Sequence, residues 1–173
     1  MRYYLGKQDM RTLQQAQEQS VLLANGLGGY ASATAAFSVN RCDQGVLVAA
    51  VKAPNLRVNM VHRLRETLIT DRGDRYLSTQ RFADETPAEE GYRDLASFRW
   101  EYVPTWTYQT RGIRVERELA MDFESNTTAV IYRMENLSGS SCTLRVEPFL
   151  KFELKEQALA EKKTFCVKPG SIS

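Results

Sequence analysis

The feature that most constrains this chain is a glycine-rich stretch near its start, Leu22-Leu23-Ala24-Asn25-Gly26-Leu27-Gly28-Gly29-Tyr30-Ala31-Ser32. An apolar run leads directly into an asparagine and three glycines. Glycine has no Cβ, so it adopts positive φ angles and lets another backbone or a ligand approach closely. Asparagine tolerates the left-handed region and forms hydrogen bonds within its own turn. The stretch therefore predicts a strand that runs into a tight, shaped turn.

Three interpretations of this turn are open. Gly26, Gly28 and Ala31 fit the spacing of the dinucleotide-binding fingerprint, with alanine in the third position. That fingerprint also needs a helix, a parallel second strand and an acidic residue about twenty positions on, and Asp43 and the apolar run 45–51 are the candidates. The residues in between are poor helix formers, and no βαβ unit follows. The other interpretations are a structural β-turn and a sugar-facing loop of an all-β domain.

Beyond this turn the sequence alternates with a period of two, which is typical of half-buried strands. Segments 58–69 and 113–121 carry this pattern, and a β-branched run follows at 128–134. Short polar turns separate 113–121 from 128–134, and 128–134 from 144–146. These last three segments predict an antiparallel meander rather than a βαβ repeat.

The predicted helical content is small. The clearest helical segment is 10–19, with Asp9 as its expected N-cap. Residues 153–163 predict either a short helix or a charged loop. A chain of 173 residues is long enough for one domain with a core. The predicted fold class is therefore mainly β, an antiparallel β-sandwich with a short N-terminal helix, formed by residues 1–173 as a single domain.

Composition excludes several classes of function. The net charge is only +2, and the basic residues form no stripe with interleaved aromatics, so no nucleic-acid partner is expected. No apolar run reaches the length of a membrane span, and the N-terminus lacks a signal-peptide pattern. Cys42, Cys142 and Cys166 predict free thiols in a reducing, cytoplasmic setting. His62 is the only histidine, so no multi-histidine metal site is expected, and no cofactor is predicted.

Candidate chemistry is sparse. Glycoside hydrolysis needs two carboxylates about 5–10 Å apart, and spacing selects no pair among the many acidic residues. Glu116 and Glu118 share one strand face, which is typical of solvated surface charges. No catalytic residue is therefore assigned. The aromatic residues between Phe98 and Tyr108 alternate, which favours a core face over a sugar-binding face. Trp106, near Pro104 in an expected bend, is the candidate for an exposed sugar platform.

Several motifs occur along the chain in a consistent order. Besides 22–32 they are Gly45-Val46-Leu47-Val48-Ala49-Ala50, Arg65-Glu66-Thr67-Leu68, Tyr76-Leu77-Ser78-Thr79-Gln80-Arg81-Phe82, Phe98-Arg99, Pro104-Thr105-Trp106-Thr107-Tyr108 and Asn126-Thr127-Thr128-Ala129-Val130. Together they resemble the N-terminal domain of bacterial and archaeal glycogen debranching enzymes of the amylo-α-1,6-glucosidase type. The resemblance runs from about Tyr3 to Phe149. It departs at Asp43-Gln44, where the family has Tyr-His, and at Val21, where a tryptophan is common.

The resemblance implies the first part of a two-sheet sandwich that precedes a catalytic α/α barrel, and this chain lacks that barrel. It implies a non-catalytic domain that packs against the barrel and helps to shape an α-glucan or glycogen site, in an enzyme that hydrolyses α-1,6 branches. Uncovered sheet edges in an incomplete sandwich also suggest a homodimer. A free-standing carbohydrate-binding module is the alternative, and a dinucleotide-binding oxidoreductase domain is the remote one. The expected carbohydrate contacts are Asn25, Gly28, Gly29, Tyr30, Arg41 and Trp106.

Overall fold

The computed structural model describes residues 3–53, 55–82 and 88–154. The elements of the N-terminal half are β1 (Tyr3–Gly6), the 3-10 helix η1 (Lys7–Met10), α1 (Leu13–Glu18), β2 (Ser20–Ala24), β3 (Tyr30–Thr34), β4 (Gly45–Lys52), β5 (Leu56–Thr70), β6 (Arg75–Tyr76) and β7 (Thr79–Gln80). They are followed by β8 (Glu89–Glu90), the 3-10 helix η2 (Gly91–Arg93), β9 (Leu95–Trp100), β10 (Pro104–Thr110), β11 (Ile113–Met121), β12 (Thr128–Asn136) and β13 (Cys142–Leu154).

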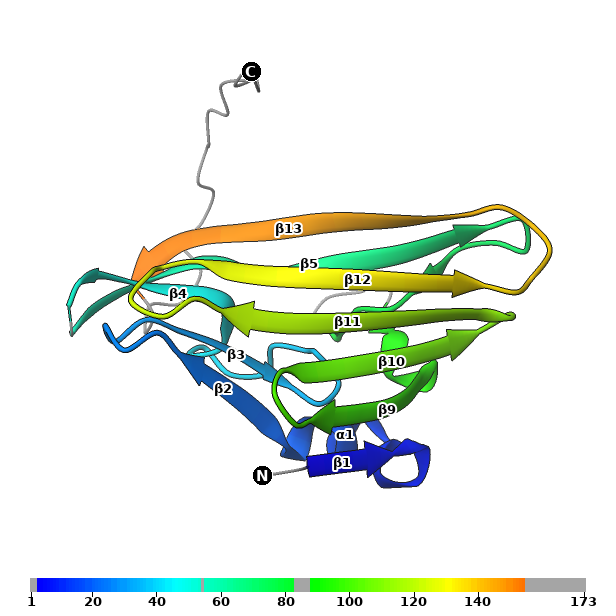
Figure 1. Cartoon of the computed structure of the whole chain (residues 1–173), viewed down its shortest axis with the longest axis horizontal. Coiled ribbons are helices and arrows are strands. Elements are labelled where there is room, and N and C mark those ends of the chain that lie inside the picture. Colours follow the sequence, from blue (N-terminus) through cyan, green and yellow to red (C-terminus); the bar gives the residue numbers. More distant parts are fainter. Residues whose placement is uncertain (1–2, 54, 83–87, 155–173) are drawn as a thin grey trace, which may run out of the picture.

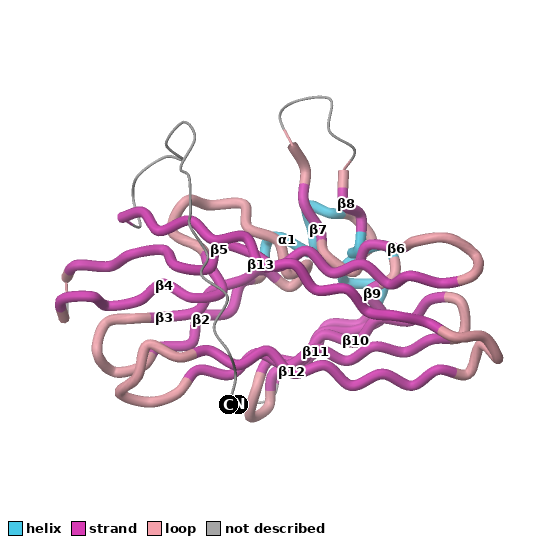
Figure 2. Tube along the Cα trace, turned by 90° about the horizontal axis from the view of Figure 1, so that it is seen from above, coloured by secondary structure: helices cyan, strands magenta, loops and turns pink. Residues whose placement is uncertain are grey.

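The strands form two main sheets that lie face to face (Figures 1 and 2). One sheet has the order β1-β9-β10-β11-β12, and the other has the order β13-β5-β4-β3-β2, with β6 added to β5. Strands β7 and β8 pair separately. Every strand pair is antiparallel. The prediction of a mainly β, antiparallel sandwich with little helix is therefore confirmed.

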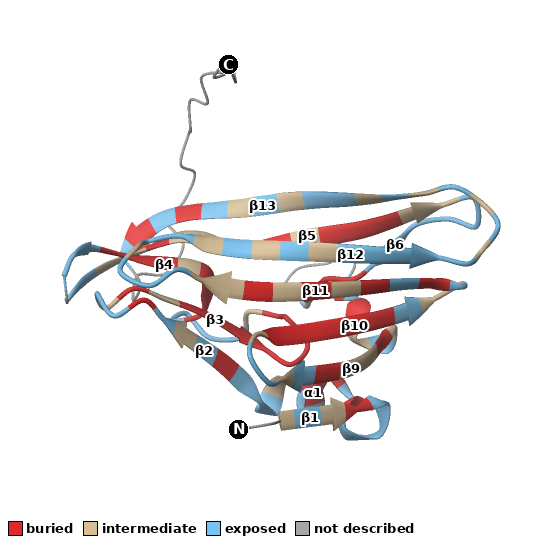
Figure 3. Ribbon diagram, in the orientation of Figure 1, coloured by how far each residue is buried: buried red, intermediate tan, exposed pale blue. Residues whose placement is uncertain are grey.

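The core lies between the sheets and is centred on aromatic side chains, as the burial colouring of β10 indicates (Figure 3). The ring of Trp106 lies 4.9 Å from that of Phe37 and 5.1 Å from that of Phe98, centroid to centroid. Tyr108 is also buried. The expected exposed platform at Trp106 is wrong, since its exposed fraction is 0%. Pro104 begins the central strand β10 instead of bending the chain outward, so Trp106 faces the opposite sheet.

The N-terminal helix differs from the prediction in its start. Thr12 is the N-cap of α1, because its hydroxyl accepts from Gln15 N at 3.2 Å and the Gln15 carboxamide accepts from Thr12 N at 3.1 Å. This reciprocal capping box satisfies two backbone donors at the start of the helix. Asp9 instead accepts from Gly6 N at 2.8 Å and closes the preceding turn η1. Within the predicted segment 10–19, only Leu13–Glu18 is α-helical, and the 3-10 helix η1 precedes it at Lys7–Met10.

The predicted meander is correct for β11 and β12 and wrong for β13. Strand β13 crosses to the other sheet and pairs with β5, from Cys142 opposite Thr70 to Leu154 opposite Val58. The 15-residue β5 leaves a long edge that the 13-residue β13 covers. The crossing turn is held at Ser140, whose hydroxyl donates to Asp71 at 2.8 Å. Of the predicted helix or loop at 153–163, the first two residues belong to β13 and the rest lies outside the described residues.

A buried ion pair joins the two sheets through the core. The Arg117 guanidinium of β11 donates to Glu66 of β5 at 2.7 Å, and Tyr132 donates to the same carboxylate oxygen at 2.7 Å. Arg117 also donates to the hydroxyl of Tyr108, and its guanidinium carbon lies 3.5 Å from the centroid of the Phe37 ring. Burial, followed by the charge of Glu66, raises the pKa of Tyr132. This cluster therefore keeps its tyrosines neutral and crosslinks the sandwich by charge-assisted hydrogen bonds.

Candidate functional site

The glycine-rich loop is a tight hairpin turn between β2 and β3. Asn25 N donates to the Gly29 carbonyl at 3.1 Å, and the Asn25 side-chain oxygen accepts from Leu27 N at 2.9 Å. Gly26 and Gly28 have φ angles of +80° and +95°, which explains the glycines. The predicted turn is confirmed. The dinucleotide interpretation is wrong, because β3 returns antiparallel to β2 with no helix between them.

Asn25 fastens this hairpin to the turn between β11 and β12. Its side-chain nitrogen donates to the Ser125 carbonyl at 2.9 Å and to the Asn126 side-chain oxygen at 3.1 Å. Asn126 in turn pairs with both backbone groups of Ala50, at 2.9 and 3.0 Å. A Cβ on Gly29 would lie 2.7 Å from the side chains of Asn25 and Asn126. Asn25 is fully buried, so it positions the loop and offers no atom to a sugar, contrary to the expectation.

A hollow of about 570 Å³ lies beside the hairpin and receives four of the six expected carbohydrate contacts. The residues brought together there are Gly28, Gly29, Tyr30 and Arg41. The Tyr30 hydroxyl donates to the Asp43 carbonyl at 2.5 Å, which holds its half-buried ring against the 39–44 loop. Arg57 donates to the Gly28 carbonyl at 2.6 Å and forms another wall of the hollow. We call this the Tyr30 hollow.

The two residues that depart from the family pattern have different environments. Gln44 is fully buried, and its carboxamide oxygen accepts from Asn40 N at 2.9 Å and Arg41 N at 3.3 Å. Asp43 is exposed and lies 3.6 Å from the Arg41 guanidinium. Gln44 therefore shapes the loop that carries Arg41, while Asp43 borders the Tyr30 hollow.

A second and larger hollow, of about 1100 Å³, lies between α1, the 39–42 segment, β5, the end of β7 and β13. We call it the α1 groove. Its lining mixes apolar surface with polar and charged side chains, which include Arg11, Gln14, His62, Gln80, Arg81 and Tyr92. Sequence reasoning identified none of these as a site, because they come from distant segments and follow no periodicity.

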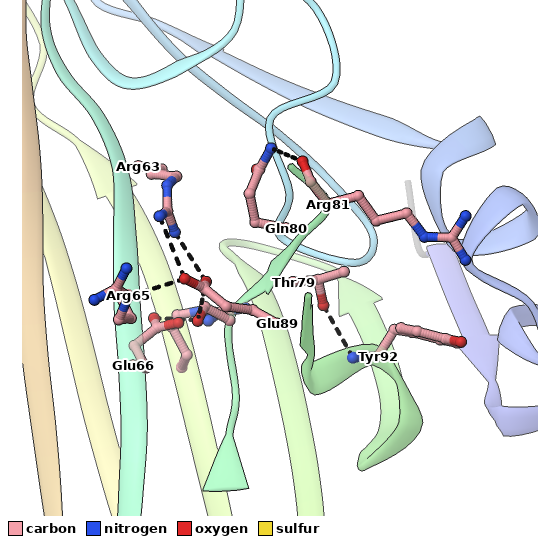
Figure 4. A network of polar contacts seen from close by, with 10 residues as sticks. Arg63, Arg65, Glu66, Thr79, Gln80, Arg81, Glu89 and Tyr92 are labelled. Carbon is pink, nitrogen blue, oxygen red and sulfur yellow. Dashed lines mark hydrogen bonds and ion pairs between the residues drawn. The ribbon is translucent and has the colours of Figure 1, made fainter. Parts of the chain in front are cut away.

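A buried carboxylate from β8 packs against the outer face of β5 and fixes one wall of the α1 groove (Figure 4). Glu89 of β8 accepts from Arg63 at 2.9 and 3.3 Å, from Arg65 at 2.9 Å and from Ser78 at 2.7 Å. The Arg63 guanidinium also stacks 4.0 Å from the centroid of the Phe149 ring. These contacts lock the small β7–β8 pair onto the large sheet.

The same β7–β8 pair carries residues to the groove. Tyr92 N donates to the Thr79 hydroxyl at 2.9 Å, which positions the tyrosine at the groove wall. A Cβ on Gly91 would lie 2.1 Å from the Leu77 carbonyl oxygen, so this close approach requires glycine. In Figure 4 the Arg81 side chain extends away from the Glu89 cluster toward the helical segment near the N-terminus.

His62 lies on the groove between positive groups. Burial, followed by the charges of Lys151 and Arg63, lowers the pKa of His62. Its Nδ1 lies 3.3 Å from the Asn59 side-chain nitrogen, so a neutral ring that accepts at Nδ1 fits this contact. His62 is therefore a neutral hydrogen-bonding group near pH 7.

The buried acids of the two clusters are engaged. Glu66 and Glu89 are paired with arginines, as described above. Glu116 and Glu118 lie 2.6 Å from Arg114 and Arg133 respectively, and their side chains are 18% and 14% exposed, so they are less solvated than the expected surface charges. Within residues 3–53, 55–82 and 88–154, no group of three or more His, Cys, Asp or Glu side chains is arranged to hold a metal ion. No helix in this part of the chain is long and apolar enough to cross a membrane.

Comparisons with known proteins agree with the fold. The family model described as glycogen debranching enzyme N terminal matches residues 19–169, which includes both hairpin strands of the glycine-rich loop and most of the two sheets. Searches among curated proteins and among solved structures gave no significant match. Because the match covers most of its length, the chain belongs to the glycogen debranching enzyme N-terminal domain family.

Proposed function

We propose that this chain is the non-catalytic N-terminal part of a glycogen-debranching α-1,6-glucosidase, which packs against the catalytic domain and helps to shape the α-glucan site. Family membership supports the connection with glycogen debranching. One observation carries the packing role. Core-facing side chains are left partly exposed along one side of the sandwich, where β12 and β13 end their sheets.

Strands β12 and β13 lie on the same side of the molecule, and in the described part of the chain each pairs along one edge only (Figure 1). Met134 is in phase with Val130 and Tyr132, which pack on the core, yet Met134 is 40% exposed. Val146 follows Leu144 at the same phase and is 37% exposed. Apolar side chains beside free strand edges are typical of a surface that another protein part covers.

Further apolar side chains extend this surface along β13. They are Leu150, Phe152 and Leu154 of β13, each between 39% and 43% exposed. We call this surface the β12–β13 side. The proposed occupant of this surface is the catalytic domain of the same enzyme. The alternative occupant is a second copy of this chain.

Mixing experiments test the packing role. The purified chain is combined with the catalytic domain of a glycogen debranching enzyme, and the complex is followed by size-exclusion chromatography with light scattering. We expect a complex that Met134→Glu and Val146→Glu each weaken, since each puts a charge on the β12–β13 side. The matched control is Tyr4→Glu, on the opposite edge strand β1, where Tyr4 is 65% exposed. If the unmodified chain forms no complex with the catalytic domain, the packing role is contradicted. If the chain instead associates with itself, and Met134→Glu and Val146→Glu abolish this association, the β12–β13 side is a homodimer interface.

The glucan role rests on the Tyr30 hollow. Its aromatic ring suits the apolar faces of glucose, and Arg41 and Arg57 can donate to hydroxyls. We expect maltooligosaccharide binding, measured by calorimetry, that Tyr30→Ala weakens and Tyr76→Ala does not. Tyr76 is a matched control, because it is 40% exposed on β6 and does not line the hollow. Turnover of limit dextrin by the chain alone would contradict a non-catalytic role.

A free-standing carbohydrate-binding module is the second candidate, and the Tyr30 hollow favours it as well. The two candidates differ in their dependence on the β12–β13 side. A free-standing module would bind maltooligosaccharide fully by itself and would ignore Met134→Glu. An enzyme domain would bind more tightly once the catalytic domain is present, because both parts would line the glucan site.

A further inference from the structure

We propose that the α1 groove is a second ligand site, which binds an anionic carbohydrate of the hexose phosphate class. This goes beyond the proposed glucan role, since the ligand and the site both differ. Among the described residues the groove and the Tyr30 hollow share only Arg41 in their linings. The inference rests on three features of the groove, which are its uncompensated positive charge, its amide groups and its aromatic wall.

Two arginines face the groove without ionic partners. Arg11 precedes α1 and Arg81 follows β7, and within the described ranges neither guanidinium forms an ion pair or a hydrogen bond. By contrast, Arg41 lies near Asp43, and Lys151 is paired with Glu153 at 3.8 Å.

Glu18 is the only acid among the groove-lining side chains of the described part, so positive charge remains in excess. The arginine fork matches a phosphate group by two parallel hydrogen bonds. Two such forks, from different segments of the chain but lining one hollow, favour an anionic ligand.

The remaining polar groups suit hydroxyls. Gln14, Gln17 and Gln80 line the groove with carboxamides, which both donate and accept as a sugar hydroxyl does. The Gln80 side-chain oxygen is buried and has no hydrogen-bond partner in the described structure. Because that oxygen is enclosed by the protein, the carboxamides open to a ligand are those of Gln14 and Gln17, of which Gln17 already donates to the Ser38 hydroxyl at 2.8 Å. Gln14 and Gln17 therefore suit a ligand that carries hydroxyl groups as well as charge.

The groove is also large enough for a small sugar ester. Its volume of about 1100 Å³ lies just above the range of about 300–1,000 Å³ that is usual for small-molecule sites. Tyr92 supplies one aromatic ring and His62 a neutral imidazole, as its lowered pKa indicates. A long neutral glucan would use several aromatic platforms, whereas in the described lining Tyr92 is the one large aromatic ring.

Calorimetry or NMR titration of the intact chain tests the site with glucose 6-phosphate, glucose, inorganic phosphate and maltotriose as separate probes. We expect glucose 6-phosphate to bind at least about tenfold more tightly than the other three, because each of them lacks either the charge or the ring contacts. Arg11→Gln and Arg81→Gln should each weaken that binding about tenfold or more. Arg75→Gln is the matched control, since Arg75 is exposed on β6 and does not line the groove.

The substituted arginines Arg11, Arg75 and Arg81 are exposed and Tyr30 is half-buried, and far-UV circular dichroism with thermal melting verifies that each variant is folded. If glucose 6-phosphate fails to bind at millimolar concentration, the proposal is overturned. It is also overturned if both arginine variants bind glucose 6-phosphate as tightly as the unmodified chain. If inorganic phosphate binds as tightly as glucose 6-phosphate, the site does not recognise the sugar. If maltotriose binds as tightly as glucose 6-phosphate, the site does not select an anionic ligand. Binding sensitive to Tyr30→Ala but not to Arg81→Gln would support the glucan role alone, so the two proposals fail separately.

Discussion

The buried ion pair between Glu66 and Arg117 allows a quantitative test of how the two sheets are held together. Both side chains are at most 1% exposed, and their closest oxygen and nitrogen atoms are 2.7 Å apart. Removing one partner of a buried pair leaves the other charge without compensation, which costs about 3–5 kcal/mol. Glu66→Leu and Arg117→Met should each lower the free energy of unfolding by that amount. For a chain of this length the melting temperature should fall by roughly 6–20 °C.

The double variant should behave differently. Glu66→Leu with Arg117→Met removes both charges and fills the space with apolar atoms. One oxygen of Glu66 and the Nε of Arg117 have no hydrogen-bond partner among the described residues, so the native pair is incompletely satisfied. Apolar replacement of such a pair is often close to neutral. We therefore expect the double variant to be more stable than either single variant, with a coupling energy of about 3 kcal/mol.

Urea denaturation followed by tryptophan fluorescence measures these effects. Trp106 is buried, and the centroid of its ring lies 5.2 Å from the Arg117 guanidinium carbon, so its emission responds to unfolding of this region. The control is Glu118→Gln on the solvent face of β11, which breaks the pair with Arg133, whose side chain is 58% exposed, and should cost less than about 1 kcal/mol. Additive losses in the double variant would refute the reasoning. Single-variant losses as small as that of the control would refute it as well.

Three further predictions concern single positions. Gly29→Ala should lower the free energy of unfolding by about 1–3 kcal/mol in chemical denaturation, because the new Cβ would clash with the side chains of Asn25 and Asn126. An unchanged denaturation midpoint would show that these two side chains do not pack tightly against residue 29. Trp106→Ala should cost about 3–5 kcal/mol through a core cavity, and loss of sugar binding with native stability would show that the ring is accessible after all. His62 has a lowered pKa in the folded state, so its protonation favours unfolding, and stability should fall as the pH drops below about 6.5. His62→Gln should flatten that part of the pH profile, and an unchanged profile would assign the effect to other groups.

Local patterns were reliable for the strands and for the turn. Alternation over 113–121 and the β-branched run at 128–134 predicted β11 and β12, and their hairpin pairing followed. The glycines and Asn25 predicted the hairpin turn. Alternation says which face a residue occupies but not which strand lies beside it. For that reason the neighbour of β13 was predicted wrongly.

The buried ion pair had a signal in the sequence that alternation could have revealed. Arg117 lies in phase with Val115 and Leu119, and Glu66 lies in phase with Leu64 and Leu68, so both charges occupy inward positions. Two inward charges of opposite sign on separate strands suggest a pair. Their contact depends on which strands face each other across the core, and that arrangement is not local.

The sequence by itself determined the β class, the shape of the glycine-rich turn and the family. Each of these depends on residues close together in the chain, whose side-chain period and backbone preferences act locally. Tertiary structure alone decided that Trp106 is buried, that Asn25 clamps a turn about a hundred residues away, and that Arg11 and Arg81 face one groove. These outcomes come from packing two twisted sheets together, which places distant segments side by side without leaving a periodic trace in the sequence.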